Sequence, residues 1–121
     1  MRILDWVLCM EQISWADFEG VELRVGTVIK VEDFPEAKKP AYKMWIDFGA
    51  EIGVKKSSGQ YTKLYTKEEL IGKQVLCCIN FPPKQVANFI SECLTCGFVG
   101  ENGEIVLAVP ERKVKNGVRL A

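Results

Sequence analysis

Period-two alternation of apolar and polar residues is the feature that most constrains what this chain can fold into. From Val21 to Glu32, apolar residues, several of them β-branched, alternate with polar or small ones. The alternation returns from Tyr42 to Phe48, with Trp45 on the face opposite the apolar one. Successive side chains of a strand point to opposite faces, so this pattern predicts strands with one buried face. Gly26, inside the first strand, predicts a bulge or sharp bend.

Short segments of the same kind continue along the chain, interrupted by one helix. A third, polar strand is expected over 52–60, a buried one over 74–80, and two more over 92–99 and 104–109. Thr66 and Glu69 form a capping-box pattern that begins a short helix, which Gly72 ends. Earlier, Ser14 and Asp17 can cap a helical turn that carries Trp15 and Phe18. These signals predict a mainly all-β fold.

The expected architecture is a five-stranded barrel of the oligonucleotide/oligosaccharide-binding (OB) type, with a short helix between strands 3 and 4 and short terminal additions. A chain of 121 residues is one ordinary domain. We therefore expect one domain over 14–121, preceded by an extension over 1–13 whose first nine residues are an upstream start or a dimer arm. Asp5 interrupts the apolar stretch of that extension, and no segment approaches the roughly 18 apolar residues of a membrane span.

Charge is balanced over the chain but unevenly placed. Sixteen basic residues face sixteen acidic ones. Residues 1–36 hold eight acidic and three basic residues, whereas residues 37–84 hold nine lysines and four acidic residues. The lysine-rich segment can build a basic face on a neutral protein, or only a well-solvated surface.

The chemistry-bearing residues predict no enzyme, no cofactor and no metal site. There is no histidine, so the commonest general base and metal ligand is missing, and no phosphate-binding glycine loop occurs. Five cysteines with uneven spacing indicate reduced thiols in a cytoplasmic protein. Cys93 with Cys96, and Cys77 with Cys78, would point to opposite faces if they lie on strands, which argues for small buried apolar residues instead of a zinc site.

Aromatic residues interleaved with lysines offer two kinds of binding surface. On an OB barrel, aromatic rings can stack bases while lysines follow phosphates. The same surface, if apolar and concave, can take an extended polypeptide. We expect about two-thirds of the aromatic residues to be core, with Phe34 and Phe81, beside loop prolines, exposed.

Several strings taken together resemble one family. They are Asp17-Phe18-Glu19, Leu23-Arg24-Val25-Gly26-Thr27, Phe34-Pro35-Glu36-Ala37-Lys38, Pro40-Ala41-Tyr42-Lys43, Ile46-Asp47-Phe48-Gly49, Glu51-Ile52-Gly53, Lys55-Lys56-Ser57-Ser58 with Gln60, Asn80-Phe81-Pro82-Pro83 and Ser91-Glu92. This set is similar to the CsaA secretion-chaperone family, which lies within the wider tRNA-binding domain family. The resemblance runs from about Ser14 to Ala121.

The resemblance implies an OB barrel whose short terminal additions build a symmetric homodimer. The lack of an apolar span predicts no membrane insertion. For CsaA the resemblance implies binding of unfolded polypeptide or preprotein segments in protein export; for the wider family it implies docking on tRNA by shape and backbone charge. The basic positions of tRNA-binding members are only partly kept, because Gln85, Ala87 and Ile90 stand where those members usually carry lysine or arginine. Losing those charges weakens phosphate binding and favours the peptide interpretation.

Two sets of candidate residues follow. For a peptide we expect apolar clefts formed by Phe34, Phe81, Pro82, Pro83, Phe89 and Ile90. For tRNA, the alternative, we expect contacts from Lys38, Lys43, Lys55, Lys56, Asn80, Lys84 and Ser91.

Overall fold

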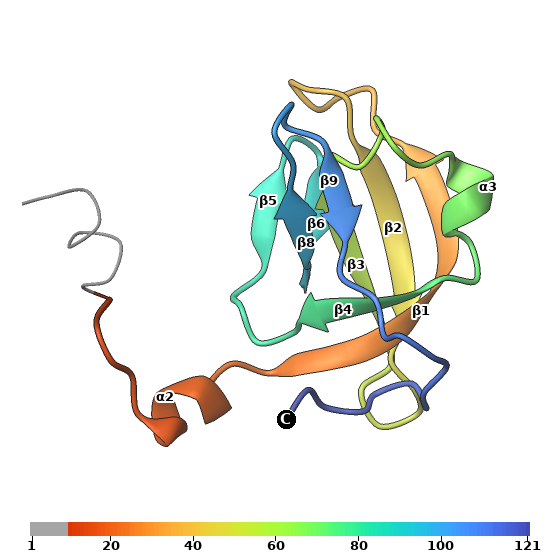
Figure 1. Cartoon of the computed structure of the whole chain (residues 1–121). Coiled ribbons are helices and arrows are strands. Elements are labelled where there is room, and N and C mark those ends of the chain that lie inside the picture. Colours follow the sequence, from red (N-terminus) through yellow and green to blue (C-terminus); the bar gives the residue numbers. More distant parts are fainter. Residues whose placement is uncertain (1–9) are drawn as a thin grey trace, which may run out of the picture.

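Five strands form the wall of a nearly closed barrel (Figure 1). The structure is a computed structural model that describes residues 10–121. The main sheet has the order β3-β2-β1-β4-β7, and two hairpins, β5–β6 and β8–β9, are attached to it. The strands are β1 (Leu23–Asp33), β2 (Tyr42–Asp47), β3 (Val54–Gly59), β4 (Gln74–Cys78), β5 (Lys84–Val86), β6 (Phe89–Ser91), β7 (Leu94–Thr95), β8 (Gly97–Val99) and β9 (Ile105–Leu107). The predicted fold class is confirmed.

Two short helices lie where their capping patterns predicted them. Ser14 caps α2 (Trp15–Glu19) through a complete capping box with Asp17. Thr66 caps α3 (Lys67–Leu70) in the same way with Glu69. The second helix stands between β3 and β4, where its Leu70 side chain is fully buried in the core. The helix therefore closes one end of the barrel.

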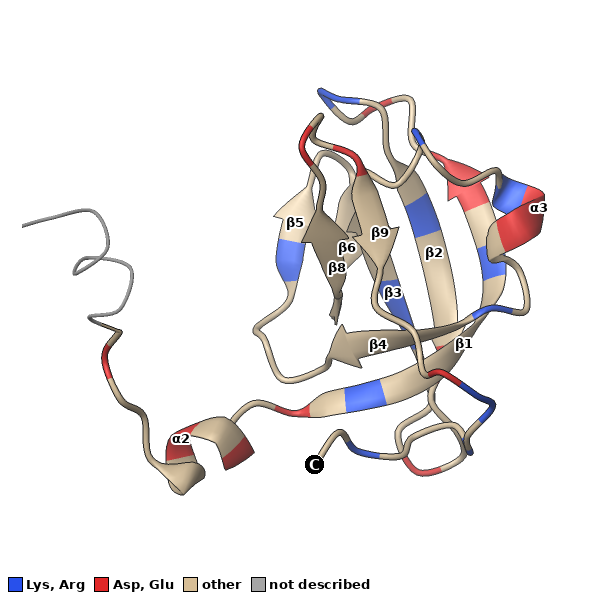
Figure 2. Ribbon diagram, in the orientation of Figure 1, with Lys and Arg blue, Asp and Glu red and all other residues tan. Residues whose placement is uncertain are grey.

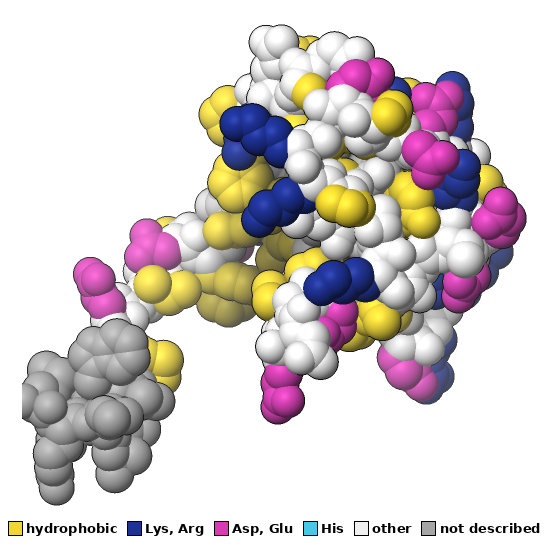
Figure 3. All heavy atoms as spheres, turned by 90° about the horizontal axis from the view of Figure 1, so that it is seen from above, with side chains coloured by type: hydrophobic (Ala, Val, Ile, Leu, Met, Phe, Trp, Pro, Cys, Tyr) yellow, Lys and Arg dark blue, Asp and Glu magenta, His cyan; other side chains and the backbone are white. Residues whose placement is uncertain are grey.

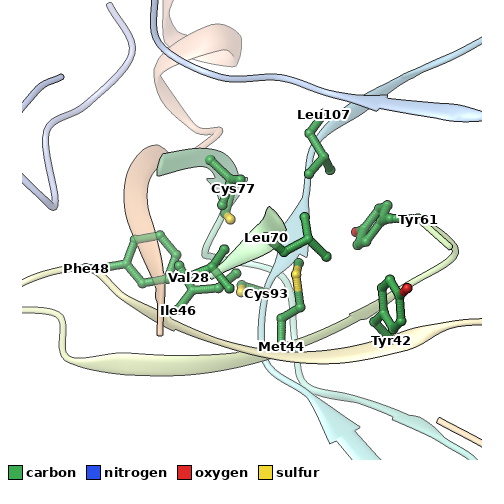
Figure 4. Packing of buried hydrophobic residues seen from close by; sticks show 11 residues of the cluster. Val28, Tyr42, Met44, Ile46, Phe48, Tyr61, Leu70, Cys77, Cys93 and Leu107 are labelled. Carbon is green, nitrogen blue, oxygen red and sulfur yellow. The ribbon is translucent and has the colours of Figure 1, made fainter. Parts of the chain in front are cut away.

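The core is built on the predicted alternation of β2 (Figure 4). Tyr42, Met44, Ile46 and Phe48 point inward and are buried, while Trp45 lies on the outer face. Val28, Val75 and Leu107 complete the packing from the other strands. The apolar face of β2 is therefore buried and its other face is only partly buried, as the alternation predicts.

The course of β1 differs from the expectation. Gly26 pairs in regular register with Val75, so there is no β-bulge at this residue. The register shift lies between Val28 and Lys30, at Ile29. Because the extra residue reverses the alternation after this point, Val28 and Val31 both pack on the core, while Ile29 between them is exposed.

The C-terminal segment provides a terminal addition beside the first half of β1. Backbone N–H groups of Gly117 and Leu120 donate to the carbonyls of Val25 and Leu23, at 2.7 Å and 2.9 Å. The side chain of Val25, on the outer face of the barrel, is consequently buried. This contact was not predicted, because it joins segments that are far apart in the sequence.

The last third of the chain is more divided than expected. The single strand predicted over 92–99 is two strands, β7 paired with β4 and β8 paired with β9. The chain passes from one pairing to the other at Cys96. The hairpin β5–β6 was not predicted, and β9 is shorter than the predicted 104–109.

Side chains join the two edges where the barrel closes. The hydroxyl of Thr95 on β7 donates to the hydroxyl of Ser57 on β3 at 2.9 Å. The Tyr61 hydroxyl donates to the carbonyl of Thr95 at 3.2 Å, and burial raises the pKa of this hydroxyl above its ordinary value. Beside them, the Glu92 N–H donates to the Lys56 carbonyl at 2.7 Å. We call the Ser57–Thr95–Tyr61 group the seam.

Residues 1–9 of the expected N-terminal extension lie outside the described residues, so the two interpretations of them stay predictions. Within residues 10–121, none of the helices has the length and apolar character needed to cross a membrane.

Candidate functional site

The hairpin β5–β6 stands on the outer face of the barrel and is anchored by Phe89. The ring centroid of Phe89 lies 5.8 Å from that of Trp45 and 5.7 Å from that of Phe34, both in edge-on geometry. Such aromatic contacts add to the stabilisation from burial. Ala87 and Asn88 form the two-residue turn, and Ala87 has a φ of 51°, a strained value for a residue other than glycine. The hairpin is thus held firmly against β2.

This anchoring corrects the expectation for two of the peptide-binding candidates. Phe34 was expected to be exposed, but only 3% of its surface is, and Phe89 is buried as well. The hairpin covers both rings. Phe89 supports the surface from beneath, whereas Phe34 still lines part of the hollow between the hairpin and the loop that joins β1 to β2. Phe81 is 55% exposed, as predicted, and Ile90 is exposed on the outer side of the hairpin.

An apolar hollow lies at the start of β5. It has a volume of about 720 Å³, and its lining includes the apolar residues Phe81, Pro82, Pro83 and Leu94. Leu94 is half exposed and was not among the predicted site residues. Leu94 stands next to Cys93 inside the strand predicted over 92–99, and nothing in that pattern indicated that its side chain would be exposed. Three of the six predicted peptide-binding residues therefore meet here.

A basic hollow lies at the other end of β5, between the hairpin and the loop that joins β1 to β2. It has a volume of about 670 Å³ and contains three lysines and one carboxylate. These are Lys38, Lys39 and Lys84, with Glu36. The net positive charge makes this hollow suited to an anionic group.

The two hollows are neighbours along β5. Both are lined by Ser58, Lys84, Gln85 and Val86, so the strand borders each of them. We call this feature the β5 groove. In Figure 1, β5 stands at the outer margin of the barrel, and Figure 3 shows lysine and apolar side chains next to one another on the same flank. The groove therefore joins an apolar surface to a basic one.

Lysine and arginine positions are spread over several elements of the barrel (Figure 2), and the predicted tRNA-contacting lysines are only partly brought together. Lys38 and Lys84 line the basic hollow of the β5 groove. Lys43 and Lys56 lie over the Phe89 ring, at 5.9 Å and 5.3 Å from its centroid. Lys55 is in register with the inward-pointing Ile46 and so lies on the opposite side of β3 from Lys56.

Lys43 is more engaged than a free phosphate-binding side chain would be. Its ammonium group lies 5.5 Å from the Phe34 centroid and 3.6 Å from a carboxylate oxygen of Glu32. A lysine held by a ring and a carboxylate is partly neutralised before any ligand arrives. Lys43 therefore contributes more to the support of the hairpin than to an open basic surface.

Asn80 and Ser91 have internal roles. Nδ2 of Asn80 donates to the carbonyl of Gly20 at 2.7 Å, and its Oδ1 accepts from the Glu22 N–H at 3.1 Å. Asn80 thus fastens the connection between α2 and β1 to the end of β4. The hydroxyl of Ser91 donates to the Cys93 carbonyl at 3.2 Å, and Ser91 also lines the apolar hollow.

Three of the four cysteines within residues 10–121 are core residues, as predicted, and Cys96 is only partly buried. Cys77, Cys78 and Cys93 are buried, and hydrogen bonding to Cys93 together with burial raises the pKa of the Cys77 thiol. A thiol held in its protonated form is a poor metal ligand. Across residues 10–121, there is no group of three or more side chains of the types that hold metal ions.

Comparisons with known proteins agree with the barrel fold described above. Residues 23–119 match the protein family described as "Putative tRNA binding domain". The chain is similar to the crystal structure of chaperone CsaA from Bacillus anthracis, with 46% identity, a TM-score of 0.86, and coverage of 92% of this chain and 100% of that one. The CsaA chaperone protein from Picrophilus torridus gives 46% identity, a TM-score of 0.85, and coverage of 91% and 100%.

Larger proteins contain a similar segment. The methionine–tRNA ligase of Pyrococcus horikoshii is 35% identical over 112 residues, which is 92% of this chain and 15% of the ligase. The ligase of Methanocaldococcus jannaschii is 32% identical over 112 residues, which is 92% of this chain and 17% of that ligase. The chain thus spans about a sixth of the length of these curated relatives.

Proposed function

Because this chain belongs to the tRNA-binding domain family, whose members share its barrel, we propose that it acts as a binding protein of the CsaA type that takes extended polypeptide segments. The observation that carries the proposal is the apolar half of the β5 groove. Exposed phenylalanine, leucine and two prolines meet there in one hollow on the surface of the barrel. An apolar hollow of this kind is typical of an interaction site.

The residues around the groove support a peptide more than a nucleic acid. Gln85, Ala87 and Ile90 are uncharged on the exposed side of the hairpin. Phosphate-backbone binding depends on the number of lysines and arginines that can each neutralise a phosphate. A half-apolar groove fits a polypeptide, which offers apolar side chains and few charges.

The wider proposal follows the CsaA likeness. The bound segments are parts of unfolded proteins or preproteins on their way to export, and the protein works in the cytoplasm as a homodimer. Binding of such segments is weak and tolerant of sequence, because ordering a flexible chain costs free energy at each binding event. Exposed Met10, Ile13 and Trp15, on the arm that precedes β1, support the dimer, since they offer apolar surface to a second copy.

The test is a titration of an unfolded, fluorescein-labelled preprotein segment into the purified protein. Replacing Phe81 and Leu94 together by alanine should lower affinity at least about tenfold, because both side chains give apolar contact area to the client. Phe98→Ala is the matched control, since Phe98 is an exposed phenylalanine on β8 outside the groove. Equal affinity in the double variant and the control would refute the assignment of the groove.

The basic half of the groove favours one alternative, binding of tRNA. Lys38, Lys39 and Lys84 could follow a phosphate backbone. This alternative predicts binding of bulk tRNA that weakens steeply between low and moderate salt, and that is reduced by replacing the three lysines with alanine. Salt-tolerant binding of the preprotein segment, with no shift of tRNA in a low-salt gel, would decide for the peptide.

A further inference from the structure

Strand β5 has one free edge. It pairs with β6 in a two-stranded sheet, and within residues 10–121 no strand pairs with its other side. The turn at Ala87–Asn88 makes Val86 and Phe89 the hydrogen-bonded pair that closes the hairpin, and Lys84 with Ser91 the next such pair. The N–H and C=O of Gln85, between them, therefore point away from β6 and along the free edge.

The β5 groove lies along this same edge. Its apolar hollow adjoins Phe81–Pro83 at the start of the strand, and its basic hollow adjoins Ala87 at the end. An extended chain placed there could bond to Gln85 with its backbone. Its side chains would meet apolar surface at one end and lysines at the other.

The inference rests on the proposed function and specifies its geometry. We propose that the bound polypeptide adds to the sheet as a strand antiparallel to β5, with acidic residues N-terminal to apolar ones. The antiparallel direction follows because antiparallel pairing is the more common and slightly more stable. An antiparallel chain begins at the Ala87 end, on the side of Lys38 and Lys39, and continues toward Phe81 and Leu94. Strand addition of this kind obtains affinity from the backbone and selectivity from the flanking pockets.

The short length of the edge explains how it can remain open. β5 has three residues, and Pro82 and Pro83 before it have no N–H to offer a further strand. Short edges and prolines are common protection against strand-to-strand aggregation. The exposed edge can accept one client segment without serving as a template for a growing sheet.

The experiment compares peptides of one composition by fluorescence anisotropy on the full chain. The probe is the labelled peptide DAESVTLSV, and its reversed sequence VSLTVSEAD is the control. We expect the acidic-first peptide to bind about tenfold more tightly, because only in that order do both ends meet complementary surface.

N-methylation of alternate backbone amides of the probe tests the strand directly. Methylating the set of amides that faces β5 should weaken binding about tenfold, as the loss of one or two hydrogen bonds does, whereas methylating the other set should have little effect. On the protein side, Gln85→Pro removes the edge N–H and should lower affinity, while Gln85→Ala keeps the N–H and should bind as the unmodified protein does.

Separate outcomes overturn separate claims. Equal affinity for both sequences, with no difference between the two methylated sets, overturns strand addition. If Phe81 and Leu94 still matter in that case, peptide binding in the groove stands. If neither peptide nor the unfolded preprotein segment binds, the proposed function is overturned together with this inference.

Discussion

At Gly26 the barrel wall comes too close to the core for any side chain. A Cβ atom placed there would lie 2.6 Å from Cγ2 of Ile46 and 2.8 Å from Cδ1 of Phe48. Both neighbours are fully buried and have little room to move. The missing side chain at this position therefore serves close packing and not a turn of the backbone.

The substitution Gly26→Ala should accordingly destabilise the protein by about 1–3 kcal/mol, the usual cost of overpacking a core. Urea unfolding followed by circular dichroism measures the change. Phe48→Leu is the second mutation of a double-mutant cycle, because its smaller side chain makes space for the new methyl group. The double variant should be more stable than the sum of the two single effects predicts, and strict additivity would contradict the packing argument.

Among the elements, α3 shows how a local signal predicts both a structure and its pH dependence. Backbone and side-chain hydrogen bonds from Thr66 lower the pKa of Glu69, which is exposed. A carboxyl whose pKa is lower in the folded protein contributes stability above its ordinary value of about 4.3, and this contribution is lost as the pH falls.

Glu69→Gln should therefore destabilise the protein most at neutral pH. The difference in unfolding free energy between the two proteins should shrink as the pH falls below about 4, because the wild-type carboxyl is then protonated as well. Denaturant unfolding at several pH values measures this. A difference that stays constant with pH would show that Glu69 does not stabilise the helix through its charge. Glu68→Gln, in the same turn but outside the capping box, is the matched control.

A second element, α2, depends on Asn80 for its attachment to the barrel. Removing the two hydrogen bonds with Asn80→Ala should speed hydrogen exchange at the Glu22 amide about fivefold, which corresponds to about 1 kcal/mol. Asn102→Ala, in an exposed turn, should leave that amide unchanged. An unchanged Glu22 amide in Asn80→Ala would mean that other contacts, such as the Arg119 bond to the Glu19 carbonyl, hold α2.

The elements that could be predicted are those whose signals are local. The alternation of β2 and the capping boxes of both helices depend on residues a few positions apart, and all three are confirmed. The hairpin β5–β6 could not be predicted, because its turn is Ala87–Asn88 and has no glycine. Missing the hairpin caused the error at Phe34, since the hairpin buries that ring.

The candidate site could be predicted only in its parts. Phe81, Pro82 and Pro83 were identified from their neighbourhood, and Lys38 and Lys84 from charge, but their meeting along β5 depends on how the hairpin lies on the barrel. Leu94 was missed for the same reason. Spatial proximity across a barrel has no signature in one sequence.

At the scale of the whole molecule, the N-terminal arm is the largest departure from a closed barrel (Figure 1). Residues 10–14 and α2 extend away from the wall, with Trp15 68% exposed. If a second copy covers this surface, the protein should sediment as a dimer at micromolar concentration.

Replacing Ile13 and Trp15 together by alanine should then shift the sedimenting species toward the monomer, because most of the apolar contact area is lost. Phe98→Ala, an exposed apolar residue on β8, should leave the dimer intact if the arm is the interface. A double variant that remains fully dimeric would exclude the arm as the main contact.

The seam is also the part of the barrel wall that should open most readily. Ser57 and Thr95 are 38 positions apart, and the hydroxyl contact between them replaces a continuous ladder of backbone bonds. Closing a loop of that length costs entropy before the contact can form, so this part of the wall should assemble late and open early. Such an opening would lie between β3 and β7, which contribute Ser58 and Leu94 to the lining of the apolar hollow. A local fluctuation of the seam would therefore widen the proposed binding surface while the rest of the core stays packed.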